Sequence, residues 1–216
     1  MPKVGMEPIR RAEAINAALE CICEHGIDKT TLDMVAARAG FSKGIVAYYF
    51  KSKKQLVVES LKAFLSSYRQ KIGSSITAGM PPLQMLEKVV EISLPSLDEE
   101  DHNTINVSIL DGMEKIRLPQ EKIAKLFIQF ISKAANDEEL KKIIKEIYAE
   151  DVKGIAGLIR NAKKANPAEG LNEDKAAYAL LAMIYGLSFF RVTDFMLPGE
   201  NDNRDIAFGW IDHFFG

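Results

Sequence analysis

Two short helix-forming stretches on either side of a glycine constrain the fold of this chain more than any other feature. Residues 31–39 and 43–50 are each long enough for about two helical turns, and Gly40 lies between them. Glycine readily adopts the positive φ of a tight turn, and Ser42 is a residue type that favours the start of a helix. Two short helices joined in this way form a helix-turn-helix, whose second helix fits the major groove of DNA.

The residues left for the outer face of this motif are basic, aromatic or small. Lys43, Tyr48, Lys53 and Lys54 combine positive charge with an aromatic ring, as a surface for phosphates and base edges requires. Gly44 leaves backbone amides uncovered near a helix N-terminus, where a phosphate can be accepted. The motif therefore predicts DNA binding through its second helix. A small helical packing motif without a DNA role is the alternative.

Charge is distributed unevenly along the chain. The net charge is −2, but residues 1–72 hold 12 Lys and Arg against 7 Asp and Glu, whereas residues 73–216 hold 16 against 23. A basic N-terminal part on an acidic remainder indicates that the N-terminal part meets a polyanion. Chance clustering of solvated charges would give the same counts, so the asymmetry supports the motif without replacing it.

Helical periodicity dominates the chain, and alternating strand patterns are nearly absent, so the predicted fold class is all-α. A capping box of Thr30 and Asp33 is expected to begin the first helix of the motif. A helix is also expected to enter at 97–101 and to be interrupted at Leu118-Pro119. The remaining helices are predicted at these approximate ranges: 8–25, 53–76, 83–95, 119–135, 136–164, 173–197 and 202–215.

The N-terminal part resembles the TetR-type transcriptional regulators. The resemblance rests on one long pattern, Ala36-x-x-Ala39-Gly40-Phe41-Ser42-x-Gly44 followed by Tyr49-Phe50-x-x-Lys53-x-x-Leu56. Within that family, residues 2–11 and 44–47 are similar to the choline-responsive repressors of betaine synthesis, although Ala47 replaces an aromatic residue common in the family. The resemblance is strong over residues 2–60 and weaker beyond them.

The resemblance implies a division of labour along the chain. Residues 1–52 would form the DNA-binding domain, and residues 53–216 a helical domain for ligand binding and dimerisation. For Tyr49, a place in the buried core is the alternative to a phosphate contact. The residues expected at or near base edges are Lys43, Gly44 and Tyr48, and those expected at phosphates are Thr31, Ser42, Tyr49 and Lys53.

The segment 173–197 is apolar on most faces, so it must be covered on all sides. The resemblance implies a homodimer through residues 173–216, in which the last two helices of each subunit pack against those of the other. Two recognition helices in such a dimer would reach half-sites about 34–36 Å apart on a near-palindromic double-stranded DNA operator. A purely intramolecular central helix is the alternative.

The resemblance also implies a cavity for a small-molecule effector. Around residues 186 and 187, where the choline-responsive subgroup has an acid and a tryptophan, this chain has Tyr185 and Ser188, and residues 111–120 look inserted. A quaternary ammonium effector would need an aromatic cage with an acidic neighbour. The effector therefore stays open. The aromatic residues that could line its site, although each could equally belong to the core, are Phe127, Phe130, Tyr148, Tyr178, Tyr185 and Phe189.

Two other classes of function compete with a DNA-binding repressor. An enzyme is disfavoured because no catalytic triad order, metal-ligand pair or phosphate loop accompanies the three histidines, so no catalytic residue, metal or cofactor is expected. A helical ligand-binding or adaptor protein without sequence-specific DNA binding is the stronger rival, and the basic N-terminal part argues against it.

The sequence indicates a cytoplasmic protein without membrane contact. Cys21 and Cys23 fall on different faces of one expected helix and have no second pair, so we expect both to be reduced. Charged residues among the first eleven argue against a signal peptide. The longest apolar run, 176–190, is shorter than the roughly 20 residues that span a bilayer.

Overall fold

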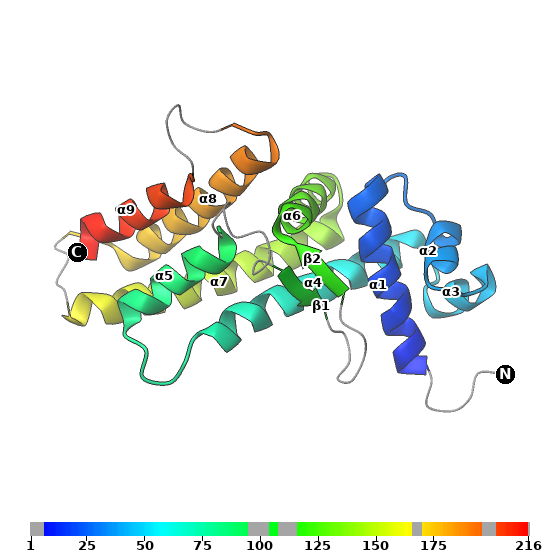
Figure 1. Cartoon of the computed structure of the whole chain (residues 1–216), viewed down its shortest axis with the longest axis horizontal. Helices are drawn as coiled ribbons and strands as arrows, with labels where there is room; N and C mark the ends of the chain where they lie inside the picture. Colours follow the sequence, from blue (N-terminus) through cyan, green and yellow to red (C-terminus); the bar gives the residue numbers. More distant parts are fainter. Residues whose placement is uncertain (1–6, 95–103, 108–115, 166–169, 196–201, 216) are drawn as a thin grey trace. The chain divides into compact units, whose positions relative to one another are not determined.

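The computed structural model describes residues 7–94, 104–107, 116–165, 170–195 and 202–215, and these residues are almost entirely helical (Figure 1). The all-α prediction is confirmed for them, apart from one short hairpin. Their internal contacts divide the chain into two units: residues 1–70 with 104–140, and residues 71–103 with 141–216. The expected functional boundary between residues 52 and 53 is a separate matter and stays a prediction.

The first unit contains the three N-terminal helices, which we call the head: α1 (Glu7–His25), α2 (Leu32–Arg38) and α3 (Lys43–Tyr49). It also contains most of α4 (Lys53–Ser75) and all of α6 (Gln120–Ala134). Helix α1 packs against α2, α3 and α6. The middle of α1 is buried on nearly all sides, and its large apolar residues there are Ile15, Leu19 and Ile22.

The turns of the head are set by two glycines. Gly26 follows α1 with a φ of +83°, and Gly40 separates α2 from α3 with a φ of +68°. Both values lie in the left-handed region that favours glycine. Val35 of α2, Val46 of α3 and Phe50 after α3 are completely buried and form a small core of the motif.

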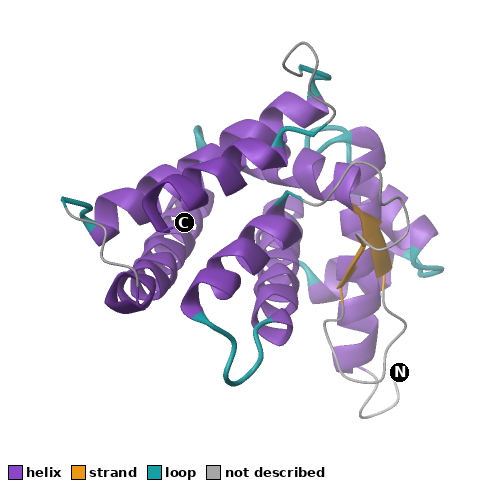
Figure 2. Ribbon diagram, turned by 60° about the vertical axis from the view of Figure 1, so that its left-hand side comes forward, coloured by secondary structure: helices purple, strands orange, loops and turns teal. Residues whose placement is uncertain are grey.

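A β-hairpin occupies part of the segment where a helix was expected. Strands β1 (Thr104–Val107) and β2 (Ile116–Pro119) pair antiparallel, with Thr104 opposite Pro119 and Val107 opposite Ile116 (Figure 2). The prediction of a helix across these residues was wrong, whereas the expected helix entry at 97–101 lies outside the described residues. Both strands pack against α6, and the buried Leu118 anchors the second one.

The second unit is built from α5 (Pro82–Ser93), α7 (Glu138–Ala165), α8 (Glu173–Val192) and α9 (Arg204–Phe215). Its core joins Leu86 and Val90 of α5 to residues of the other three helices, among them Ile159, Leu180 and Ile211. Helix α8 ends earlier than the expected residue 197. Asp194 adopts a φ of +53°, and such a left-handed residue ends a helix.

Helix α8 has 20 residues and contains the apolar run 176–190. By length and composition alone α8 could cross a membrane, although one such helix is weak evidence. Ala176, Leu180 and Ile184 face the core of the second unit. Tyr178, Phe189 and Phe190, in contrast, are exposed on the same helix.

Candidate nucleic-acid interface

The start of α2 is fixed by two adjacent threonines with different roles. The Thr31 hydroxyl accepts a hydrogen bond of 3.2 Å from the Met34 amide, so Thr31 is the N-cap. Thr30 is buried, and its hydroxyl donates to the Gly26 carbonyl oxygen at 2.8 Å. The prediction of a capping box of Thr30 and Asp33 was therefore wrong, and the Asp33 carboxylate makes another contact.

Helix α3 presents its predicted DNA-contacting residues to solvent. Lys43 and Gly44 are exposed, and the Tyr48 side chain is 67% exposed. Ser42 occupies the N-cap position, but its hydroxyl makes no capping hydrogen bond. The outer face of α3 therefore offers an ammonium group, a phenol, a hydroxyl and uncovered backbone amides, which together can contact phosphates and base edges.

Two other predicted phosphate contacts are less available. Tyr49 is only 6% exposed, and its ring lies edge-on to Tyr48 with a centroid separation of 5.2 Å. The Lys53 ammonium donates to the Asp28 carbonyl oxygen at 2.6 Å, which ties the start of α4 to the loop before α2. Tyr49 thus belongs chiefly to the packing of the head, and Lys53 would have to exchange this bond for a phosphate.

Lys43 has an ion-pair partner on the neighbouring helix. Its ammonium lies 2.8 Å from the carboxylate of Asp33 on α2. Both side chains are about two-thirds exposed, at 66% and 62% respectively. Exposed pairs of this kind are weak, typically below about 1 kcal/mol, so the pair can open when another acceptor arrives.

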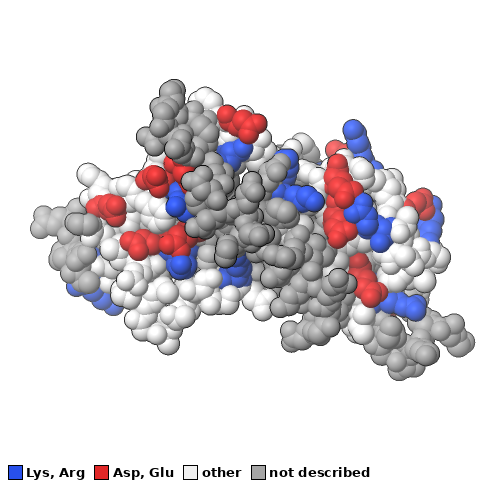
Figure 3. All heavy atoms as spheres, viewed as in Figure 1, with Lys and Arg blue, Asp and Glu red and all other residues white. Residues whose placement is uncertain are grey.

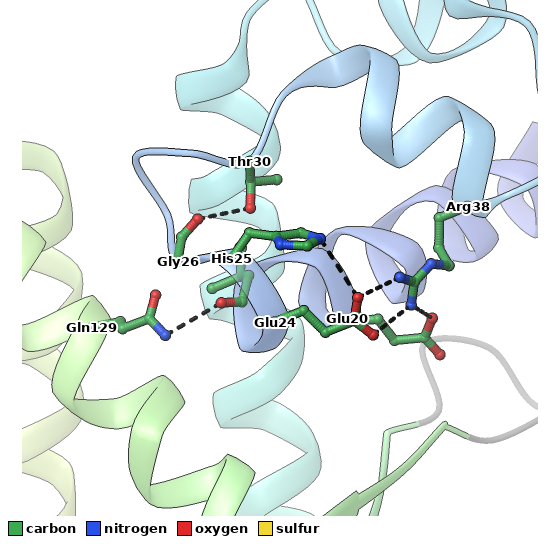
Figure 4. Close-up of polar contacts among 8 residues, drawn as sticks. Glu20, Glu24, His25, Gly26, Thr30, Arg38 and Gln129 are labelled. Carbon is green, nitrogen blue, oxygen red and sulfur yellow. Dashed lines mark hydrogen bonds and ion pairs between the residues drawn. The ribbon is translucent and has the colours of Figure 1, made fainter.

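Arg38 at the end of α2 is held by two carboxylates of α1. Its guanidinium donates to Glu20 at 3.1 Å and to Glu24 at 2.9 Å (Figure 4). The hydrogen bond from Arg38 lowers the pKa of Glu24 below its ordinary value. These contacts fix α2 against α1, and they occupy the Arg38 cation inside the head.

The end of α1 is closed by a side chain from α6. The Gln129 carbonyl oxygen accepts from the Ile27 amide at 3.0 Å, and its NH₂ group donates to the Ile22 carbonyl oxygen at 3.2 Å. Gln129 points from α6 towards the turn at Gly26, as Figure 4 shows. One side-chain amide therefore binds the Ile27 amide beyond the helix and adds a second hydrogen bond to the Ile22 carbonyl oxygen, which also accepts from the Gly26 amide.

Further polar contacts join the same parts of the first unit. The Lys133 ammonium of α6 lies 2.6 Å from the Asp28 carboxylate. Lys54, expected on the outer face of the motif, instead pairs with Asp137 at 3.0 Å and with Glu139 at 3.4 Å. Sequence reasoning missed these connections, because the partners lie far apart in the chain and no local pattern marks them.

The aromatic residues expected at an effector site fall in different surroundings. Phe127 and Phe130 pack around Phe64 in the first unit, and Phe130 is fully buried. In the second unit, the rings of Tyr148 and Tyr185 lie 5.1 Å apart, and burial raises the pKa of Tyr148 to about 12. Tyr178 and Phe189, in contrast, are largely exposed on α8.

Comparison with known proteins identifies the N-terminal motif. Residues 14–59 match the family described as bacterial regulatory proteins, tetR family. The HTH-type transcriptional regulator BetI of Agrobacterium fabrum is 35% identical over 96 residues, which are 44% of this chain and 47% of that protein. BetI of Rhizobium meliloti is 27% identical over 187 residues, or 87% and 80% of the two chains. The first of these alignments thus spans about half of its relative's length.

Solved structures extend the similarity to the fold of the whole chain. A putative transcriptional regulator from Saccharomonospora viridis, crystallised in complex with choline, has a TM-score of 0.72 at 17% identity, over 94% of each chain. A likeness at this identity shows a shared fold. Residues 14–59 thus match a tetR-family helix-turn-helix segment, and the chain as a whole shares the fold of solved structures such as the Saccharomonospora viridis protein. Over most of its length the chain is also similar to BetI of Rhizobium meliloti.

Proposed function

We propose that this protein is a ligand-responsive repressor that binds a near-palindromic DNA operator as a homodimer in the cytoplasm. The observation that carries the proposal is the exposed face of α3. Lys43, Gly44 and Tyr48 stand in solvent on a helix that Val46 and Phe50 anchor to the core of the head. A short helix held rigidly with polar groups outward is the form that major-groove readers take.

Dimerisation through residues 173–216 is supported by the exposed apolar side chains of α8 and its surroundings. Of the seven large hydrophobic residues that are exposed in the described part of the chain, five lie in this region. Contiguous exposed apolar surface marks an interaction site. A second copy of the chain would cover these residues, which are Tyr178, Phe189, Phe190, Phe195 and Ile206.

The effector site that we propose centres on Tyr148 and Tyr185 in the second unit. Their rings are in contact, and the Tyr148 side chain is partly buried. The choline complex of the Saccharomonospora viridis regulator makes small quaternary ammonium compounds the first candidates to test. Tyrosine faces attract such cations. Effector binding would favour one of two dimer states that space the recognition helices differently.

Replacing Lys43 and Tyr48 together by alanine tests the DNA-binding part of the proposal. The operator would first be recovered by selection from a random duplex library with the wild-type protein. The double variant should lose the mobility shift on that operator and keep the wild-type mass in sedimentation, because both side chains are exposed and lie outside residues 173–216. Retention of sequence-specific binding by the double variant contradicts the proposed interface.

A helical ligand-binding protein without sequence-specific DNA binding predicts a different result. The selection would then return no common sequence, and any DNA binding would disappear steeply with added salt. Sedimentation of a Tyr178→Glu and Phe189→Glu variant tests the dimer separately. Charges on an apolar interface should dissociate it, and an unchanged mass would contradict dimerisation through α8.

A further inference from the structure

We propose that Asp33 restrains the binding of DNA of arbitrary sequence by holding the Lys43 ammonium in an ion pair until a DNA site offers a better acceptor. This inference rests on the proposed function, because Lys43 must lie in the DNA interface. It identifies a residue that weakens the binding of the head to DNA. Asp33 would therefore set how strongly the head binds DNA outside its operator.

Lys43 carries the whole formal charge of α3. The helix reads Lys-Gly-Ile-Val-Ala-Tyr-Tyr, so one carboxylate at 2.8 Å from its ammonium neutralises the recognition helix. Asp33 is free for this contact because Thr31, and not Asp33, accepts the capping hydrogen bond of α2. The ion pair therefore lies on the surface and plays no part in capping α2.

Two further cations of the head are also paired with carboxylates. Arg38 is held by Glu20 and Glu24, and Arg11 lies 3.3 Å from the Glu59 carboxylate. In the view of Figure 3, acidic and basic atoms lie side by side over the head and form no broad area of one sign. The folded head therefore attracts a polyanion less strongly than the net positive charge of the N-terminal part suggests.

Sequence-independent binding depends on cations that neutralise phosphates and release counterions. In the wild type, Lys43 must leave Asp33 to do this, and the carboxylate then remains near the phosphates with a like charge. Both terms oppose binding, and both disappear when the carboxylate is replaced by an amide. Because the pair is exposed and weak, a well-placed acceptor in an operator can still open it.

The test compares Asp33→Asn with Asp28→Asn, which removes the same charge from the same unit. Asp28 pairs with Lys133 of α6 and also lies near Lys53, so its amide variant reports the effect of removing a carboxylate that does not pair with Lys43. Binding to a fluorescently labelled duplex of arbitrary sequence is measured by anisotropy across a salt series. Asp33→Ser provides a second neutral variant, and thermal melting verifies that each variant is folded.

We expect Asp33→Asn to tighten binding about two- to fivefold at low salt and to steepen the slope of log K against log salt by about 0.9. The same change should have a smaller effect in a Lys43→Gln background. The inference is overturned if Asp28→Asn acts equally, or if Asp33→Asn acts equally without Lys43. If Lys43→Gln binds as tightly as wild type, the proposed interface itself fails. If Lys43→Gln weakens binding while Asp33→Asn changes nothing, only this inference fails.

Discussion

Replacing Gln129 by methionine should loosen the C-terminal end of α1. Methionine has a similar length but makes neither of the two hydrogen bonds, at 3.0 Å from Ile27 and 3.2 Å to Ile22. Each such bond contributes about 0.5–1.5 kcal/mol net, so the two together contribute about 1–3 kcal/mol. Both residues are buried, so water reaches the freed Ile27 amide poorly, whereas the Ile22 carbonyl oxygen keeps its hydrogen bond from the Gly26 amide. We therefore expect a loss of about 2 kcal/mol in the stability of the first unit.

Hydrogen exchange at the Ile27 amide is the direct measurement. A local loss of about 1.4 kcal/mol accelerates exchange tenfold, so the variant should exchange at least about tenfold faster at this amide. Gln129→Glu keeps an acceptor for Ile27 and loses the donor to Ile22. Its exchange rate at the Ile27 amide should therefore lie between those of the wild type and the methionine variant. Ser132→Ala, on the exposed side of α6, is the control. Wild-type exchange at Ile27 in the methionine variant would refute this account of the turn.

Three further predictions concern other parts of the chain. Burial raises the pKa of Tyr148 to about 12, so the folded protein keeps the phenol proton after the unfolded chain has lost it near pH 10. The free energy of unfolding should therefore fall between pH 10 and 12. In urea titrations, Tyr148→Phe should reduce this fall. Gly40→Ala should lower stability by about 1–2 kcal/mol through its positive φ alone, because an added Cβ meets no atom within 4 Å, and Gly40→Asn should cost less in the same assay. Asp202→Ala should destabilise the second unit by on the order of 3 kcal/mol, because it removes a carboxylate paired with the nearly buried Arg191, and calorimetry would detect this loss.

The local chemistry of the head could be predicted from its sequence. Gly40 and Ser42 mark the turn and the start of α3, and both lie where expected. These features are encoded within a few residues of each other, so a reader of the sequence needs no knowledge of distant partners.

The contacts that position the head could not be predicted in the same way. Gln129 reaches Ile27 across 102 residues, and nothing near either residue indicates the contact. Tyr49 and Tyr48 are adjacent and identical in type, yet one is buried and the other exposed, because α3 turns them towards different surroundings. The hairpin was missed because its strands have four residues each, too few for an alternating pattern to stand out.

The expected division at residue 52 would suggest that the DNA-binding domain can be separated from the ligand-binding domain. The contact of Gln129 with the end of α1 argues against cutting this chain at residue 52 or 59, since either cut separates α1 from the side chain that closes it. A chimera that keeps this head should therefore also carry residues 104–140, which belong to the same packing unit. In a natural lineage, the same dependence would require α6 and α1 to change together.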